Sequence, residues 1–219
     1  TSASITGPKP TRAGGYFADA LKFNDGGNYG DLVEVANAAA INLGNYLSVA
    51  FWARADATSA NAYPIHRLAS TTGQSSAWSI RWSDSGDIIW TVVGASTVAL
   101  DTSADGAANP YAMVSGRWFH YVCTFDKDTG FMSVIRDGAL VARKTHGLAS
   151  INSASLGPIQ IGCATLDGAL VADSSFHGRI ADVKVRSLAD EDPALASPNL
   201  GPNRITRRRY LARDIDPTE

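Results

Sequence analysis

Residues 116–145, GRWFHYVCTFDKDTGFMSVIRDGALVARKT, predict three consecutive antiparallel strands with their turns. Residues 118–125 are aromatic and β-branched, which is typical of a half-buried strand. The turn residues DKDTG at 126–130 separate them from a second strand at 131–136. Asp137-Gly138 is a strong signal for a two-residue hairpin, after which residues 139–145 run back. A chain with this meander must build at least one antiparallel sheet.

Further short runs repeat the same pattern of alternating faces and turn residues, and none of the chain reads as a convincing amphipathic helix. The 219 residues are 45% hydrophobic, enough for one domain with a sizeable core. The sequence therefore predicts an all-β, two-sheet antiparallel sandwich over residues 16–195, with an extended N-terminal arm at 1–15 and a C-terminal basic tail at 196–219. The predicted strands are 20–23, 31–35, 47–54, 65–69, 78–82, 88–93, 97–100, 159–162 and 176–185.

Charge and hydropathy argue against two classes of partner, nucleic acids and the membrane interior. A net charge of −2 argues against a nucleic-acid-binding protein, which needs a strong basic excess. No apolar run reaches the roughly 18 residues of a membrane span, and residues 1–15 show no signal peptide. The two cysteines, Cys123 and Cys163, are too few for a disulfide framework, and we favour free buried thiols over a single bond.

Four segments together resemble the concanavalin A-like (laminin G-like) jelly roll in the order that this family uses them. They are ALKFNDGGNYGDLVEV, LSVAFWAR, GRWFHYVCTFDKDTG with SVIRDGALVARK, and IQIGCA with FHGRIADVKVRSLADED. The resemblance covers roughly residues 18–192 and implies the fold. It implies no single function, because the family includes lectins, carbohydrate-binding modules, adhesion domains, sialidase accessory domains and viral coat or fibre proteins.

Catalysis is not expected. A retaining glycosidase needs two carboxylates about 5 Å apart, and in a related sandwich family they stand in a Glu-x-Asp-x-x-Glu motif. None of the three glutamates, Glu34, Glu191 and Glu219, has that spacing. The paired aspartates 84/87 and 126/128 fall in predicted turns, where Asp is expected for backbone reasons alone.

The resemblance implies a structural Ca²⁺ where the first strand meets the last. Asp182 matches the family's closing-strand aspartate, and Asn24 and Asp25 lie in the matching first turn. Hard oxygen ligands of this kind suit Ca²⁺. The alternative is that Asp182 lies on a solvated face beside Lys184 while Asn24 and Asp25 simply form a turn, and the sequence leaves both open.

Three tryptophans, Trp78, Trp82 and Trp90, fall in one predicted hairpin, as an aromatic surface for sugars would require. Alternation places Trp78, Ile80 and Trp82 on one face of their strand. Trp90 lies across the hairpin from them, on the neighbouring strand. A buried sheet face needs the same aromatic area, so we favour core packing for all three over glycan binding.

The two ends suggest a role in assembly. An ordered polar arm needs a partner, because fixing each residue's backbone costs about 1–2 kcal/mol. We expect that partner to be another protein subunit, whose carboxylates would pair with the tail arginines. The sequence thus predicts a non-enzymatic virion protein (capsid decoration, fibre or tail), the alternative being a carbohydrate-binding or adhesion module of a secreted protein, at a virion or extracellular surface. The predicted docking residues are Arg204, Arg207, Arg208, Arg209, Tyr210 and Arg213.

Overall fold

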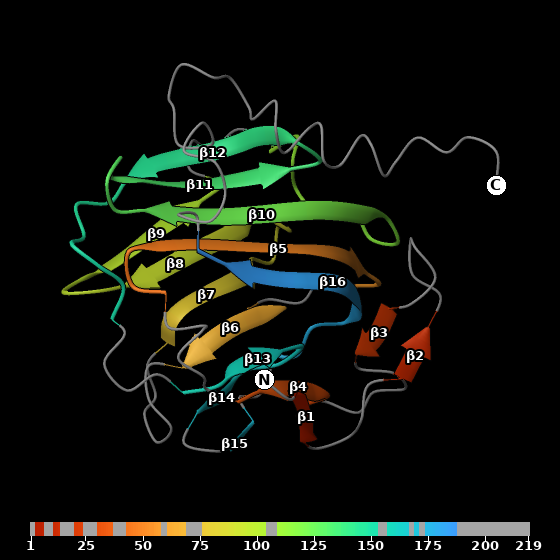
Figure 1. The fold of residues 1–219 in the computed structure, drawn as a ribbon. Helices are drawn as coiled ribbons and strands as arrows, with labels where there is room; N and C mark the ends of the chain where they lie inside the picture. The colour runs from red at the N-terminus through yellow and green to blue at the C-terminus, as the bar shows by residue number, and fades with distance from the viewer. Residues whose placement is uncertain are drawn as a thin grey trace, which may run out of the picture.

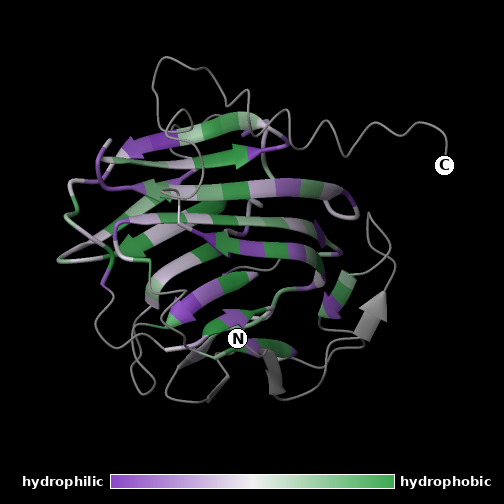
Figure 2. Ribbon diagram, in the orientation of Figure 1, coloured by the Kyte–Doolittle hydropathy of each residue, from purple (hydrophilic) through white to green (hydrophobic). Residues whose placement is uncertain are grey.

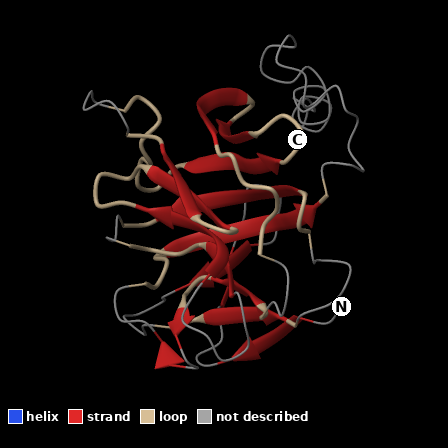
Figure 3. Ribbon diagram, turned by 90° about the vertical axis from the view of Figure 1, so that its left-hand side faces the viewer, coloured by secondary structure: helices blue, strands red, loops and turns tan. Residues whose placement is uncertain are grey.

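The protein is a two-layer β-sandwich (Figure 1). The computed structural model describes residues 3–6, 11–13, 20–23, 30–36, 43–57, 61–68, 76–103, 109–152, 157–166, 169–170 and 174–187. All regular elements in these ranges are strands, as the side view also shows (Figure 3). None of the described residues belongs to a helix of the length and hydrophobicity that a bilayer crossing requires.

Each layer is a seven-stranded antiparallel sheet. Sheet 1 has the order β1 (Ala3–Thr6), β4 (Leu32–Val35), β13 (Ile159–Ile161), β6 (Ile65–Leu68), β7 (Ser76–Trp82), β8 (Ile88–Val93) and β9 (Thr97–Asp101). Sheet 2 has the order β12 (Ala139–Thr145), β11 (Phe131–Arg136), β10 (Trp118–Asp126), β5 (Tyr46–Ala55), β16 (Gly178–Arg186), β3 (Ala20–Phe23) and β2 (Thr11–Ala13). A short hairpin, β14 (Thr165–Leu166) and β15 (Ala169–Leu170), forms a third sheet.

The predicted sandwich and meander are confirmed. Strands β10, β11 and β12 start and end within one residue of the expected positions. Asp137 and Gly138 have φ angles of 50° and 78°, the left-handed pair that a tight hairpin turn requires. Hydropathy alternates along β5, β10 and β16 in Figure 2, so each strand presents one face to the opposite sheet.

The core lies between the sheets and contains a cluster of aromatic rings. The Trp82 indole stacks on Phe176 at 5.3 Å and meets Phe51 edge-on at 6.3 Å, which joins β7 to β5 across the layers. The Trp90 Nε1 donates a hydrogen bond to the Thr124 carbonyl on β10, 3.0 Å away. The cysteines are free and buried, as predicted.

The N-terminal segment differs from the prediction. We expected residues 1–15 to be an arm apart from the sandwich, but Ala3–Thr6 pairs with β4 and Thr11–Ala13 pairs with β3. The physical reason is that the outermost strand of a sheet leaves a row of N–H and C=O groups that an extended segment can satisfy. These two pieces of the predicted arm are therefore edge strands of the sandwich.

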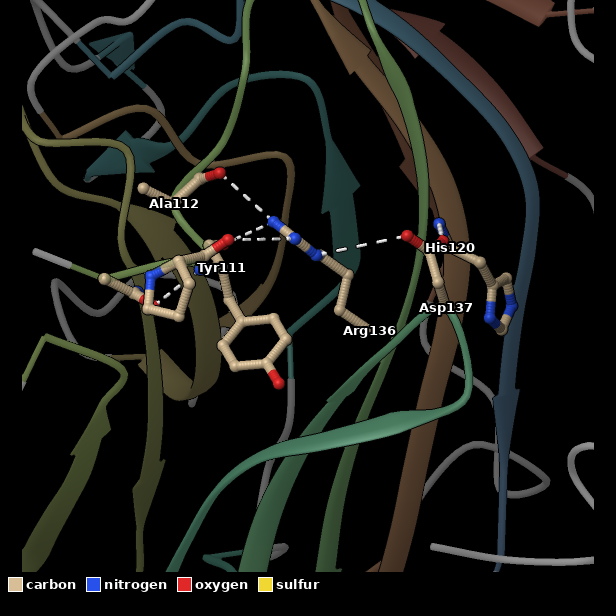
Figure 4. Close-up of polar contacts among 7 residues, drawn as sticks. Tyr111, Ala112, His120, Arg136 and Asp137 are labelled. Atoms are coloured by element: carbon tan, nitrogen blue, oxygen red, sulfur yellow. Dashed lines mark hydrogen bonds and ion pairs between the residues drawn. The ribbon is translucent and has the colours of Figure 1, made fainter.

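One arginine fixes a long connection to the sandwich. The Arg136 guanidinium at the end of β11 donates through Nη1 to the carbonyls of Tyr111 (2.6 Å) and Ala112 (3.1 Å), as Figure 4 shows. The same group lies 4.3 Å from the centre of the Phe119 ring. The adjacent Asp137 carboxylate accepts a hydrogen bond from the His120 backbone N–H. The segment before β10 is thus held against the end of sheet 2.

Candidate functional site

Three basic residues stand side by side on the outer face of sheet 2. Arg179 on β16 pairs with Lys22 on β3 and with Arg54 on β5, so the three occupy directly opposed positions on adjacent strands. Directly opposed residues point to the same face of a sheet. Their neighbours in sequence, such as Ile180 and Ala53, belong to the core, so the basic side chains face outward. We call Lys22, Arg54 and Arg179 the cationic row.

The same face carries further charge next to the row. Lys184 and Arg186 of β16 pair with Ala50 and Ser48 of β5, which share the outward face with Arg54 by the two-residue period. The Arg54 and Lys184 side chains are 31% and 27% exposed. Both can therefore contact a molecule that lies on the face.

An aromatic pair lies beside the cationic row. Trp52 of β5 and His120 of β10 are paired residues whose rings lie 5.1 Å apart. Burial, and then the charge of Lys184, lower the pKa of His120 to about 4, whereas Asp182 acts to raise it. His120 is therefore neutral near neutral pH, and the charge of this face comes from its lysines and arginines.

Strand β16 is irregular next to the row. Its register on β5 shifts between Ala181 and Lys184, and Asp182 in this bulge has a φ of 50°. The bulge borders a pocket of about 290 Å³ at the edge of the sandwich. The pocket is lined by Ala20, Leu21, Phe23, Ile161, Ile180, Ala181, Asp182 and Val183.

The outer face of sheet 1 carries a different arrangement, a buried polar network around Gln160. The His66 Nε2 donates to the Gln160 Oε1 at 2.5 Å, and the Gln160 Nε2 donates to Thr165 Oγ1 (2.7 Å) and Glu34 Oε2 (3.2 Å). Burial lowers the pKa of His66 to about 4. Because each strong donor and acceptor of Gln160 is used within the network, this arrangement stabilises the sheet and offers little to a ligand.

The three tryptophans predicted as an alternative sugar-binding surface are core residues. Trp78, Trp82 and Trp90 are 2%, 1% and 0% exposed, and they point into the space between the sheets. The alternative of a sugar-binding surface is therefore wrong for these residues. The reason is that the face of β7 and β8 that bears the indoles is the face that meets sheet 2. The interpretation as core packing, which we favoured, describes these residues.

Of the three predicted calcium ligands, only Asp182 lies among the described residues. Asn24 and Asp25 lie outside the described ranges. Asp182 forms an ion pair with Lys184, and no group of three acidic, His or Cys residues suited to a metal occurs within the described ranges. The calcium site stays a prediction.

Predicted docking residues in the tail, 204–213, also lie outside the described ranges. The structure thus gives no account of Arg204, Arg207, Arg208, Arg209, Tyr210 or Arg213. The proposed pairing of the tail with another subunit stays a prediction.

The buried aspartates hold turns, as the sequence predicted. Asp87 accepts hydrogen bonds from Asn109 Nδ2 (2.6 Å) and from the Ser85 hydroxyl. Asp126 Oδ1 accepts from the backbone N–H groups of Asp128 (2.9 Å) and Thr129 (3.1 Å). Asp126 satisfies the backbone of its own turn, and Asp87 also joins its turn to Asn109 in the segment before β10.

Sequence reasoning missed the cationic row. Its members are single basic residues in apolar strands, ALKF, FWAR and HGRI, and each by itself looks like an ordinary solvent-facing position. They become neighbours only through the pairing of β3, β16 and β5, strands that are far apart in the sequence. The alternation in each strand gave the outward direction, but nothing local gave the register.

The sequence matches the family model of the concanavalin A-like lectin/glucanases superfamily over residues 25–192. No curated protein matches it. Domain 4 of AbnA, an extracellular GH43 arabinanase from Geobacillus stearothermophilus solved with arabinotriose, is similar with a TM-score of 0.63 and 14% identity, over 84% of this chain and 82% of that one.

Two other solved structures have the same fold. The Ruminococcus gnavus IT-sialidase CBM40, bound to α2,3-sialyllactose, has a TM-score of 0.56 at 12% identity, over 70% of this chain and 89% of that chain. The binding domain of Paraclostridial Mosquitocidal Protein 1 has a TM-score of 0.62 at 16% identity, over 86% of this chain. This chain spans about half of that binding domain, 45% of its length. At these identities the likeness shows the fold.

Proposed function

The chain belongs to the concanavalin A-like lectin/glucanases superfamily, and on that premise we propose that it is a non-catalytic module that binds carbohydrate. A fold alone does not assign a function, so the proposal needs support from the molecule itself. It takes up the second of the two roles that the sequence suggested, the carbohydrate-binding or adhesion module. The sandwich would act as a rigid support whose outward face contacts the glycan.

The observation that carries the proposal is the likeness to the arabinanase domain, which extends over more than four fifths of both chains. That protein is a single domain of a secreted enzyme and was solved with arabinotriose. Because the match covers a similar share of each chain, this chain has the size and strand layout of such a module. The sialidase CBM40 adds a second carbohydrate-binding relative in fold, solved with a different sugar.

Three of the described carboxylates, Asp87, Asp126 and Glu34, have structural roles, which supports binding rather than catalysis. Glycosidases of the retaining type need a pair of carboxyl groups about 5 Å apart and open to the substrate. Asp87 and Asp126 are used by their own turns, and Glu34 accepts a hydrogen bond from Gln160. Each of these groups is therefore explained by a structural role.

The role as a virion subunit stays a prediction. It rested on two ends that need another molecule in order to become ordered. Strands β1 and β2 pair with the chain's own sheets, so these parts of the N-terminal segment give it no support. A variant that lacks residues 203–219 would separate the two roles: a carbohydrate-binding module keeps its glycan affinity, whereas an assembly subunit loses incorporation.

The direct test is binding of the intact chain to an array of glycans, followed by calorimetry on the best ligands. We expect saturable binding to at least one class of oligosaccharide with no change in the sugar. Release of a shorter product during incubation would show an enzyme instead. Failure to bind any glycan, with the protein folded as judged by circular dichroism, would refute the proposal.

A further inference from the structure

The cationic row breaks a general rule of sheet construction. Like charges that directly oppose each other on neighbouring strands destabilise a sheet. Here Arg54 opposes Arg179, and Arg179 opposes Lys22, so two like-charged pairs follow one another across β5, β16 and β3. Departures of this kind from the local rules of sheet construction are expected where function requires them.

Charge is concentrated on this face although the chain as a whole is slightly acidic. Lys184 and Arg186 add two more cations to the same face of β16, while the chain has a net charge of −2. Acidic groups near these residues include Asp56, 3.5 Å from the Arg54 Nε, and Asp182, which pairs with Lys184. Among the described residues of β3, β5 and β16, this face carries five cations, and the acids paired with them are Asp182 on β16 and Asp56 just after β5.

We infer that the outer face of sheet 2, along the cationic row, binds an acidic glycan whose carboxylate or sulfate groups lie across Lys22, Arg179 and Arg54. The inference rests on the proposed carbohydrate-binding function and names the chemical class of its ligand. Adjacent strands are about 4.8 Å apart, so the row places three positive groups within about 10 Å. Arginine suits such a ligand because its planar fork donates two parallel hydrogen bonds to one oxyanion.

The chemistry of the face favours a glycan over a nucleic acid. A nucleic-acid-binding domain of this size normally has a large basic excess, and this chain has a pI near 6.0. The face holds a short row of charge rather than a long stripe. An acidic oligosaccharide carries few negative groups, about one on each acidic sugar unit. This small number suits the three cations of the row.

Paired glycans that differ in a single acidic group provide the test. Sialyllactose is compared with lactose, and oligogalacturonate with its methyl ester, while a sulfated heparin hexasaccharide covers the sulfate class. The row variant replaces Lys22, Arg54 and Arg179 by Gln. The matched control replaces Arg117, Lys127 and Lys144 by Gln, three exposed cations outside the row, so that both variants lose the same charge. Urea unfolding and circular dichroism check the fold of each.

We expect the intact chain to bind an acidic member of one pair at least tenfold more tightly than its neutral partner. The row variant should lose that preference, and the control variant should keep it. Arg179→Lys, which retains the charge but removes the planar fork, should fall between the intact chain and the row variant.

Four results would overturn the inference. Equal affinity for acidic and neutral glycans would leave the carbohydrate-binding function in place and remove its acidic ligand. An equal loss of affinity in the row and control variants, or equally tight binding of a short DNA duplex, would mean that only overall charge matters. Binding to none of the glycans would refute both the inference and the proposed function.

Discussion

The Nη1 of Arg136 lies 2.6 Å from the backbone carbonyl oxygen of Tyr111, and this hydrogen bond joins the end of β11 to the segment that leads into β10. The same nitrogen reaches the Ala112 carbonyl, and Nη2 reaches that of Pro110 at 3.4 Å. One planar cation thus satisfies three successive carbonyls. Loops without regular hydrogen bonds need such a donor wherever they approach the body of a protein.

Removing this cation should loosen the loop. We expect Arg136→Met, which keeps the apolar stem, to lower the free energy of unfolding by about 1–3 kcal/mol, because hydrogen bonds to a charged group are lost. Hydrogen exchange should rise in residues 111–116 before it rises in β10. Urea unfolding and exchange mass spectrometry measure the two effects.

Arg117 provides the control. Its guanidinium also lies over the Phe119 ring, at 5.4 Å, but on the exposed surface. Arg117→Met should cost less than about 1 kcal/mol, the usual strength of an exposed contact between a cation and a ring. Equal losses in the two variants would show that the ring contact, and not the carbonyl contacts, is what matters.

Gly162 shows where the end of β13 allows no side chain. Its φ is 96°, and a Cβ there would overlap Cδ1 and Cε1 of Phe23 and lie 2.9 Å from the Asp31 carbonyl oxygen. We expect Gly162→Ala to cost about 2–4 kcal/mol, from overpacking together with the left-handed backbone. Thermal and urea unfolding give the value.

The matched substitution is Gly147→Ala. Gly147 also has a positive φ, 66°, but no atom lies within 4 Å of a Cβ built there. Only the backbone cost of about 1–2 kcal/mol remains. A loss at Gly147 as large as that at Gly162 would mean that Phe23 moves aside without cost.

Acid should destabilise the fold through two buried histidines. The pKa of His66 and of His120 is lowered from 6.5 to about 4 in the folded protein, mainly by burial. Between pH 6.5 and pH 4 the unfolded chain therefore binds protons that the folded chain does not, so stability is present above pH 6.5 and is lost as the pH falls. Each histidine should contribute a loss of about 2 kcal/mol between pH 7 and pH 5.

A pair of substitutions isolates this effect. Combining His66→Gln with His120→Gln should lower stability at pH 7, because the hydrogen bond to Gln160 and the ring contact with Trp52 are lost. The same variant should lose far less than the intact protein between pH 7 and pH 5. An unchanged slope of stability against pH would assign the acid sensitivity to other groups.

The strands could be predicted from the sequence because their evidence is local. The alternation in β5 placed Leu47, Val49 and Phe51 on the core side, and all three are fully buried. The dipeptide Asp137-Gly138 fixed one hairpin through its φ requirements. Features of this kind depend on a few adjacent residues, so a single sequence contains them.

Features that depend on pairing between distant segments could not be predicted. The cationic row exists because β16 lies between β5 and β3, and Gln160 meets His66 because β13 pairs with β6. The bulge at Asp182 has only a weak local signal, since Asp is uncommon in strands and tolerates a positive φ, and the shift of register depends on the pairing with β5. Trp118 pairs with Arg54 and is half-buried at the outer face of β10, a position that depends on the pairing of β10 with β5. Which distant strands pair with each other depends on the packing of the whole core, and a short stretch of sequence does not contain that information.

Trp82 separates a structural role of the aromatic residues from a role in binding sugar. Its indole contacts Phe51, Tyr121 and Phe176 and is 1% exposed. We expect Trp82→Leu to lower the free energy of unfolding by about 3 kcal/mol, because the smaller side chain leaves a cavity between the sheets. Trp118→Leu, at a half-buried position, should cost less.

Glycan affinity of the folded Trp82→Leu protein should equal that of the intact chain, since no ligand on the outer face reaches this ring. A folded variant that no longer binds glycan would place the ligand between the sheets and contradict the assignment of the indoles to the core.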